Sequence, residues 1–371
     1  MQYARLELQI AQVERLIKNS RKKFSNKKKE EIYTNLIALF TNIKNSNYQS
    51  FSPPDLFYSK LALDIVFYSI EFLSYKTEKG IPKRLIFCLN KVLNDWILNG
   101  TDEYFIVVSY NKTPDNFFIW GFDQEQLTGL QPLFKSLFSI DYSQSLIQIS
   151  KPKFLSDDYL SSIPLYHELG HFIDRNYQIT KSLSREPGFS AHGISQIHFS
   201  EYFADLFAAQ YIGKSAVAPL DINVNIVSPT HPINADRIEV VNTFIDGTGS
   251  PRSMNIVQEL TRITLIRTGS DLRIRYTNLS DEENPFNSLL PQVLDDSTKL
   301  HSLFLEAWNN WLDPKSKIRT KYLDHSRCST EINRLIRSSI KLTMQKNESN
   351  KFKRAGNYLQ NIALKYRLIK D

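Results

Sequence analysis

The segment His167-Glu168-Leu169-Gly170-His171 has a spacing that suits metal chemistry. Residues four apart lie on one face of an α-helix, one turn from each other, so both histidines can bind the same metal ion. In this HExxH pattern the metal is zinc and the glutamate serves as a general base. We therefore predict His167 and His171 as ligands of one zinc ion per chain, with Glu168 as the base.

The residues around this motif favour a buried helix. Apolar side chains recur at Leu165, Leu169, Phe172 and Ile173, as expected for a helix with one face in a core. Pro164 suits the first turn of that helix, where its missing N–H group costs nothing. A coincidental HExxH match would not require this apolar pattern, so the pattern supports a real metal-binding motif.

A third zinc ligand is expected from elsewhere, because a catalytic zinc ion usually takes three protein ligands. The best source is a later helical segment, HFSEYFADLFAAQYIG. In this segment Glu201, Ala204 and Ala208 share a face, and the small alanines allow another helix to approach closely. Glu201 is the favoured ligand. His198, near the same face, and His192, beside a glycine, are the alternatives.

Two further residues have predicted supporting roles. Asp205, one turn after Glu201, is placed to accept a hydrogen bond from the non-ligating N–H of a zinc-bound histidine. The loop SPTHP at 228–232 leads into a predicted helix, and its prolines restrict where His231 can point. At an active site, His231 would donate a hydrogen bond to an oxyanion. The alternative is an ordinary histidine in a surface loop.

Taken together, these segments resemble the gluzincin metallopeptidases, with HExxH at 167–171, ExxAD at 201–205 and THP at 230–232, followed by Arg237. The last segment is similar to the CAAX-prenyl-protease branch, whose transmembrane spans are missing here. The resemblance covers roughly residues 145–245. It implies zinc bound by the two histidines and the ExxAD glutamate, the HExxH glutamate as base, a later histidine that assists the transition state, and Arg237 as a supporting residue.

The resulting hypothesis is a zinc-dependent peptidase that cleaves a protein or peptide. Strand 146–150, beside the cleft and with one free edge, would hold an extended peptide through backbone hydrogen bonds. Two alternatives stay open. One is a metallopeptidase-like module that binds or regulates a partner without turnover, and the other is a zinc hydrolase that acts on a small amide.

Short strands are expected just before the HExxH helix. Tyr104–Tyr110 and Phe117–Phe122 are rich in aromatic and β-branched residues and are predicted to pair as a hairpin across a polar connection. Leu146–Ser150 is a further predicted strand. The sequence thus favours a small sheet next to the helix that carries the histidines.

The remaining sequence has helical periodicity. The predicted fold is α+β and mostly helical, with a zincin-like domain at 101–250 between helical regions at 1–100 and 251–371. Helices are expected at Met1–Lys18, Glu30–Ile43, Asp55–Tyr75, Pro82–Leu98, Ile256–Arg267, Leu300–Trp311, Glu331–Met344 and Tyr358–Leu368.

Composition restricts the cellular setting. The N-terminus has charges where a signal peptide would be apolar, and no stretch reaches the roughly 20 apolar residues that a membrane span requires. Cys88 and Cys328 are far apart, so a reducing cytoplasm is expected. The first 50 residues carry 10 Lys/Arg against 4 Asp/Glu, and residues 314–371 carry 15 against 4. We interpret these basic ends as solvated helix faces rather than a nucleic-acid site, because no nucleic-acid motif accompanies them.

Overall fold

The computed structural model describes residues 3–20, 24, 26–74, 83–98, 100–111, 117–120, 124–141, 146–155, 158–187, 193–222 and 230–367. The described chain is mostly helical with one small sheet, which confirms the α+β expectation at that level. No helix in these ranges is long and apolar enough to cross a membrane.

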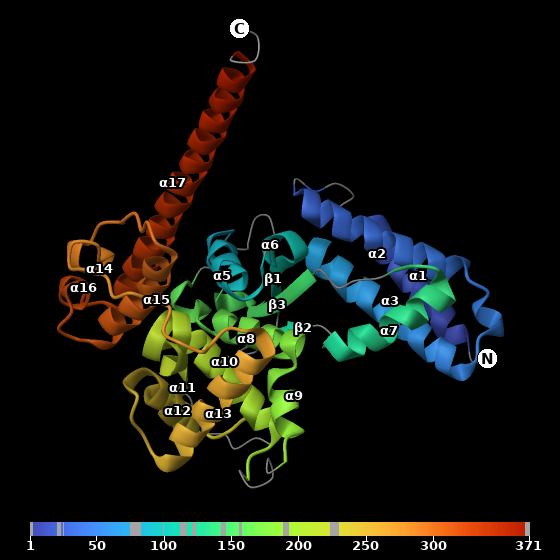
Figure 1. Cartoon of the computed structure of the whole chain (residues 1–371), viewed down its shortest axis with the longest axis horizontal. Helices are drawn as coiled ribbons and strands as arrows, with labels where there is room; N and C mark the ends of the chain where they lie inside the picture. The colour runs from blue at the N-terminus through green and yellow to red at the C-terminus, as the bar shows by residue number, and fades with distance from the viewer. Residues whose placement is uncertain are drawn as a thin grey trace.

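Four helices form an N-terminal lobe, which extends to one side of the molecule (Figure 1). They are α1 (Ala4–Asn19), α2 (Lys27–Asn45), α3 (Pro53–Ser74) and α7 (Gln124–Phe138). In α1 the residues Leu6, Ile10 and Val13 recur at helical spacing and are buried. The first three helices agree with the sequence, whereas α7 was not expected. Its internal Pro132 weakens the local helical signal, since proline disfavours a helix interior.

The sheet joins this lobe to the rest of the molecule. Its strands are β1 (Phe105–Asn111), β2 (Phe118–Trp120) and β3 (Leu146–Pro152), in the order β1-β3-β2. β1 is parallel to β3, and β2 is antiparallel to it. The predicted hairpin of the first two strands is therefore wrong. Both strands instead pair with β3. Helix α7 lies between β2 and β3 in the chain, and this long connection allows β3 to return between the first two strands.

The central place of β3 also corrects the expectation of a free edge at 146–150. Both edges of β3 are hydrogen-bonded to neighbours, and all seven of its residues are buried. The outer strand on the side of the HExxH helix is β2, which contacts that helix. A peptide that adds to this sheet near the helix would pair with β2.

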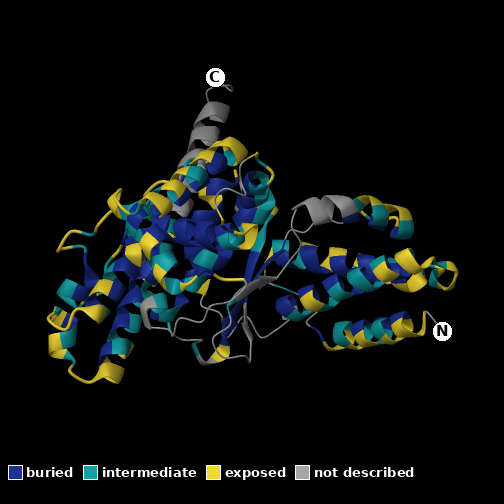
Figure 2. Cartoon of the chain, turned by 90° about the horizontal axis from the view of Figure 1, so that it is seen from below, coloured by how far each residue is buried: buried dark blue, intermediate teal, exposed yellow. Residues whose placement is uncertain are grey.

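A block of helices packs against the sheet and contains many of the buried apolar residues. The principal ones are α5 (Lys83–Trp96), α8 (Pro164–Tyr177), α9 (Ile179–Ser184), α10 (Gln196–Ile212), α12 (Asn234–Asp246) and α13 (Pro251–Thr268). Figure 2 shows buried residues concentrated in this block and exposed residues around its outside. Helix α10 is its centre, and every residue from Glu201 to Ile212 is buried.

The C-terminal region adds α14 (Pro285–Ser288), α15 (Ser297–Leu312), α16 (Lys317–Lys321) and α17 (His325–Arg367). Helix α15 packs on α10, so this region supports the central block. The two helices predicted at 331–344 and 358–368 are one 43-residue helix, α17, whose end projects away from the body (Figure 1). The residues between them contain no proline and continue the helical hydrogen bonding. The boundaries near 100 and 250 stay predictions.

Short elements connect the larger ones: the helix α6 (Gly100–Glu103), the helix α11 (Ala218–Ile222), and the 3-10 turns η1 (Tyr48–Ser50), η2 (Lys153–Leu155), η3 (Leu160–Ser162) and η5 (Gly213–Val217). The turn η3 leads directly into α8 at Pro164, the first residue of that helix. The sheet and the HExxH helix are therefore close together in the chain as well as in space.

Candidate metal centre

Helix α8 carries the HExxH motif and is built as the sequence predicts. Leu165, Leu169 and Ile173 are buried on its core side. The opposite side presents His167 and His171, whose ring centroids lie 4.6 Å apart with the rings perpendicular. The two rings therefore face one region next to the helix.

Helix α10 approaches α8 closely enough to bring a carboxylate to that region. A Cβ atom added at Gly170 would lie 3.0 Å from the Cα atom of Ala204 and 3.1 Å from the Cβ atom of Phe207. The glycine on α8 permits this spacing, because a side chain at position 170 would meet the backbone of α10. The small residues thus determine how near Glu201, one turn before Ala204, can come to the histidines.

Glu201 lies between the two histidines. Its Oε2 atom is 3.4 Å from His167 Nε2, and its Oε1 atom is 3.4 Å from His171 Nε2. One ligand atom from each of the three residues lies within 4.8 Å of the others, so this group could hold a metal ion. The structure thus brings together the three predicted ligands from two helices, α8 and α10, that are separated by the 18 residues 178–195 of the chain.

The dimensions and chemistry of this group suit a metal ion. Two ligands bound to zinc at about 2.0–2.2 Å in tetrahedral geometry are roughly 3.4 Å apart, which is the separation of each histidine from Glu201. Moreover, Glu201 Oε2 is buried and makes no short hydrogen bond with a described residue. Its charged neighbours lie at ion-pair distance: His167 Nε2 is 3.4 Å away, and His231 Nε2 and Arg237 Nη2 are each 3.6 Å away. A buried carboxylate oxygen held only by such longer contacts would be stabilised further by a bound cation.

Asp205 holds the first histidine. Its Oδ1 atom is 2.8 Å from His167 Nδ1, so the ring nitrogen that faces away from Glu201 has a carboxylate partner. Arg237 on α12 donates to both oxygens of Asp205, from Nε and from Nη2, at 2.7 Å each. The structure places both predicted supporting residues at the site, and it shows that Arg237 acts on the histidine through Asp205.

The charges around His167 favour a cation between it and Glu201. Burial alone would lower the pKa of His167, but hydrogen bonds to Asp205 and Glu201 outweigh burial and raise it to about 10. Burial would likewise raise the pKa of Glu201, yet the two histidines hold it well below its usual range. Without a metal, the proton on His167 supplies the positive charge that these two carboxylates favour. Binding of a metal would release that proton.

Asp205 and Arg237 form a buried ion pair with opposite shifts. Burial opposes the charge of Asp205, but the guanidinium of Arg237 outweighs burial and lowers the pKa of this carboxyl group. In turn, burial would lower the pKa of Arg237, whereas Asp205 raises it above the usual range. Both groups are therefore charged at neutral pH, and Arg237 holds the Asp205 carboxylate in place as the acceptor for His167 Nδ1.

Ser200 and Asp174 hold the second histidine, and neither was predicted. The Oγ atom of Ser200 is 3.3 Å from His171 Nδ1 and donates a hydrogen bond of 2.7 Å to Asp174 Oδ2. Two spacings in the sequence could have identified them. Ser200 directly precedes Glu201, and Asp174 follows His171 by three residues, on the same helical face.

Glu168 and His231, the predicted base and oxyanion donor, differ in burial. Glu168 follows His167 on α8 and is 7% exposed. His231 precedes α12, and its side chain is 52% exposed. The Nε2 atom of His231 is 3.6 Å from Glu201 Oε2, and its Nδ1 atom is 2.8 Å from Thr230 Oγ1. His231 thus lies next to the candidate ligand Glu201, on an exposed side of the site.

Of the two rival ligands, only His198 lies in the described residues, and it is not part of this group. His198 is in the first turn of α10, where its backbone N–H donates to the capping hydroxyl of Ser195. His192 lies outside the described residues, as do the residues Ser228 and Pro229 of the predicted loop.

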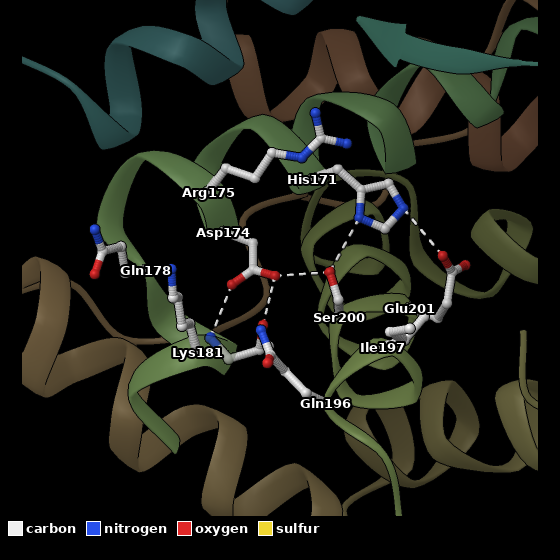
Figure 3. A pocket seen from close by; sticks show the side chains of 10 residues that line it. His171, Asp174, Arg175, Gln178, Lys181, Gln196, Ile197, Ser200 and Glu201 are labelled. Carbon is white, nitrogen blue, oxygen red and sulfur yellow. Dashed lines mark hydrogen bonds and ion pairs between the residues drawn. The ribbon is translucent and has the colours of Figure 1, made fainter. Parts of the chain in front are cut away.

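A cavity of about 320 Å³ lies beside the second histidine (Figure 3). It runs along α8, α9 and the first turns of α10. Glu201 and His171 line one end, and Ser200 and Asp174 line its wall. The other lining residues are Arg175, Gln178, Thr180, Lys181, Gln196 and Ile197. The cavity is therefore directly next to the candidate metal ligands and has room for a side chain of a bound molecule.

Comparison with models of protein families, with curated proteins and with solved structures found no match for this chain. The resemblance to gluzincins therefore stays a prediction from three motifs. Function has to be argued from the geometry and chemistry of the site itself.

Proposed function

We propose that the chain is a gluzincin-type zinc metallopeptidase. The observation that carries the proposal is the convergence of His167, His171 and Glu201 on one point, with their ligand atoms within 4.8 Å of one another. Glu168, the predicted base, is the next residue after the first histidine on the same helix. No other arrangement of His, Asp, Glu and Cys in the described residues combines these features.

The ligand types favour zinc over other ions. Two imidazole nitrogens and one carboxylate are a frequent ligand set for catalytic zinc, whereas calcium and magnesium prefer oxygen ligands alone. Three protein ligands leave one coordination position for water or substrate, which a structural zinc site does not offer. This supports a catalytic rather than a structural ion.

The chain's residues would divide the chemistry among them. A zinc ion at this site would supply a Lewis acid that brings the pKa of a water molecule to about 7 and polarises a carbonyl group. Glu168 would accept the proton of the attacking water and pass it to the leaving amine. His231 would donate a hydrogen bond from Nε2 to the oxyanion that forms at the substrate carbonyl. Asp205 would keep His167 in the required tautomer.

A peptide is the substrate that the surroundings favour. The outer strand β2 is adjacent to α8, and an extended chain could pair with it through backbone hydrogen bonds. The cavity next to His171 offers room for one substrate side chain. A cytoplasmic location stays a prediction, which two buried cysteines without a disulfide support.

Two variants test the proposal together. His167→Ala removes a ligand, so the zinc content should fall from about one per chain to nearly none. Glu168→Gln keeps the shape of the side chain but cannot accept a proton, so it should retain zinc and lose hydrolysis. Cleavage products in cells that express the wild type or Glu168→Gln would identify substrates by comparison of protein termini.

The outcomes separate the three hypotheses. Full hydrolysis by Glu168→Gln would contradict the mechanism. Zinc in the wild type without any differential cleavage would favour a binding or regulatory module. Turnover of small amides without cleavage of any peptide would favour the small-amide hydrolase.

A further inference from the structure

We propose that Ser200 and Asp174 are positioning residues that fix the tautomer of His171, so that its Nε2 lone pair faces the metal. This proposal rests on the proposed zinc site. It adds a function for two residues that touch neither the metal nor the substrate. The carrying observation is a chain of hydrogen bonds from α9 through Asp174 and Ser200 to the ring of His171 (Figure 3).

Asp174 is the fixed end of this chain. It is 4% exposed and accepts three hydrogen bonds from described residues. The backbone N–H of Thr180 donates to Oδ1 at 2.8 Å, and the Thr180 hydroxyl donates to Oδ2 at 2.7 Å. Ser200 donates to the same Oδ2 atom, also at 2.7 Å. As a carboxylate, Asp174 can only accept, so all three neighbours must be donors.

The direction of the next hydrogen bond follows from this one. A serine hydroxyl has one proton, and Ser200 gives its proton to Asp174. Towards His171 Nδ1, 3.3 Å away, the Ser200 oxygen can then only accept. His171 must therefore carry its proton on Nδ1. The lone pair of the neutral ring is on Nε2, the atom that lies 3.4 Å from Glu201.

The two histidines thus have different supports. His167 donates directly to the carboxylate of Asp205, while His171 reaches a carboxylate only through a hydroxyl group. The second support also ties three helices together, because Asp174 is on α8, Thr180 on α9 and Ser200 on α10. Ser200 and Asp174 line the cavity, so this support forms the wall next to the metal ligands.

The sharpest test is Asp174→Asn, which keeps the size of the side chain. The amide oxygen must remain opposite the Thr180 backbone N–H, because that group can only donate. The amide NH2 group then faces Ser200 and donates to it, so the Ser200 proton is released towards His171 Nδ1. This reverses the hydrogen bond and favours the tautomer with a proton on Nε2, which cannot bind zinc. Zinc affinity should fall about 10–100-fold, the usual effect of losing such support.

Ser200→Ala completes the series. Without the serine hydroxyl neither tautomer is imposed, and if about half of the rings hold the competent form, affinity should fall only about twofold. In the Ser200→Ala background, Asp174→Asn should add little, because the connecting hydroxyl is already gone.

Two readouts distinguish this support from general packing. Zinc affinity is measured by competition with a chromophoric chelator, with folding of each variant checked by circular dichroism. In metal-free protein at alkaline pH, nitrogen NMR of labelled histidine reports which nitrogen of His171 carries the proton. We expect Nδ1–H in the wild type and Nε2–H in Asp174→Asn.

The proposal is overturned if Asp174→Asn binds zinc as tightly as the wild type, or if Ser200→Ala weakens zinc more than Asp174→Asn does. Equal tautomers in the wild type and Asp174→Asn would overturn it as well. Failure of the zinc site is a separate result, because then the wild type itself would bind no zinc. A peptidase assay is not needed for either outcome.

Discussion

Gly170 allows a direct test of how the spacing of two helices controls the candidate metal centre. Replacement by alanine would place a Cβ atom 3.0 Å from Ala204 Cα and 3.1 Å from Phe207 Cβ. Carbon atoms in proteins rest about 3.5–4.0 Å apart, so the new atom is too close by about 0.5 Å. Both opposing atoms belong to or adjoin the backbone, and neither can rotate away. The clash is relieved only if α8 and α10 move apart.

At Gly170 the change to alanine should lower the free energy of unfolding, whereas the same change in an unconstrained helix raises it. Alanine in place of glycine inside a helix normally adds about 1 kcal/mol of stability. Over-packing of a rigid core costs about 1–3 kcal/mol, and here the neighbours are fully buried, which favours the upper part of that range. For Gly170→Ala we therefore expect a net loss of about 1–2 kcal/mol. Gly170→Val, with two further carbon atoms, should lose more.

The same displacement should weaken metal binding. Ligand distances in metal sites hold to within about 0.2 Å, and a shift of about 0.5 Å between the helices exceeds that tolerance. We expect the affinity for zinc to fall about tenfold, as for other disturbances of the supporting shell. Urea unfolding of the metal-free protein measures the packing effect, and chelator competition measures the affinity.

A stabilising effect of Gly170→Ala would refute the reasoning. It would mean that the helices are not in close contact in solution, and then Glu201 would have no structural reason to reach the histidines. Loss of stability with unchanged zinc affinity would refute only the second step, the link between helix spacing and ligand geometry.

Two further predictions concern the residues around the ligands. Asp205→Ala leaves the buried guanidinium of Arg237 without its bidentate partner and should cost about 3–5 kcal/mol in urea unfolding of metal-free protein. Adding Arg237→Met to that variant should restore part of the loss, and no recovery would argue against a buried ion pair. His231→Ala should retain zinc but lower kcat/KM for a cleaved peptide about 10²–10³-fold. Unchanged turnover would assign His231 to the surface loop alone.

Much of the site could be predicted because its signals are local. His167 and His171 are one helical turn apart, and any helix brings such residues to one face. Glu201 and Asp205 share a face of α10 for the same reason. The choice of Glu201 over His198 also came from the segment itself, whose alanines indicate a close helix contact.

Other features depend on contacts between distant parts of the chain. Strand β3 pairs with both β1 and β2, and the local composition of the strands gives no information about this order. Helix α7, which makes that order possible, has a proline in its interior and was missed for that reason. The merging of two predicted helices into α17 shows a similar limit, because a gap in apolar periodicity is not a helix end.

The sequence by itself determined which residues could bind a metal and on which helices they lie, since periodicity places them before any folding takes place. Only the tertiary structure decided how they are held. The contact between Gly170 and Ala204 sets the reach of Glu201. The pairing of Arg237 with Asp205, and the chain from Asp174 through Ser200 to His171, link side chains of different helices. Such links depend on distances between helices, which packing fixes and local sequence does not.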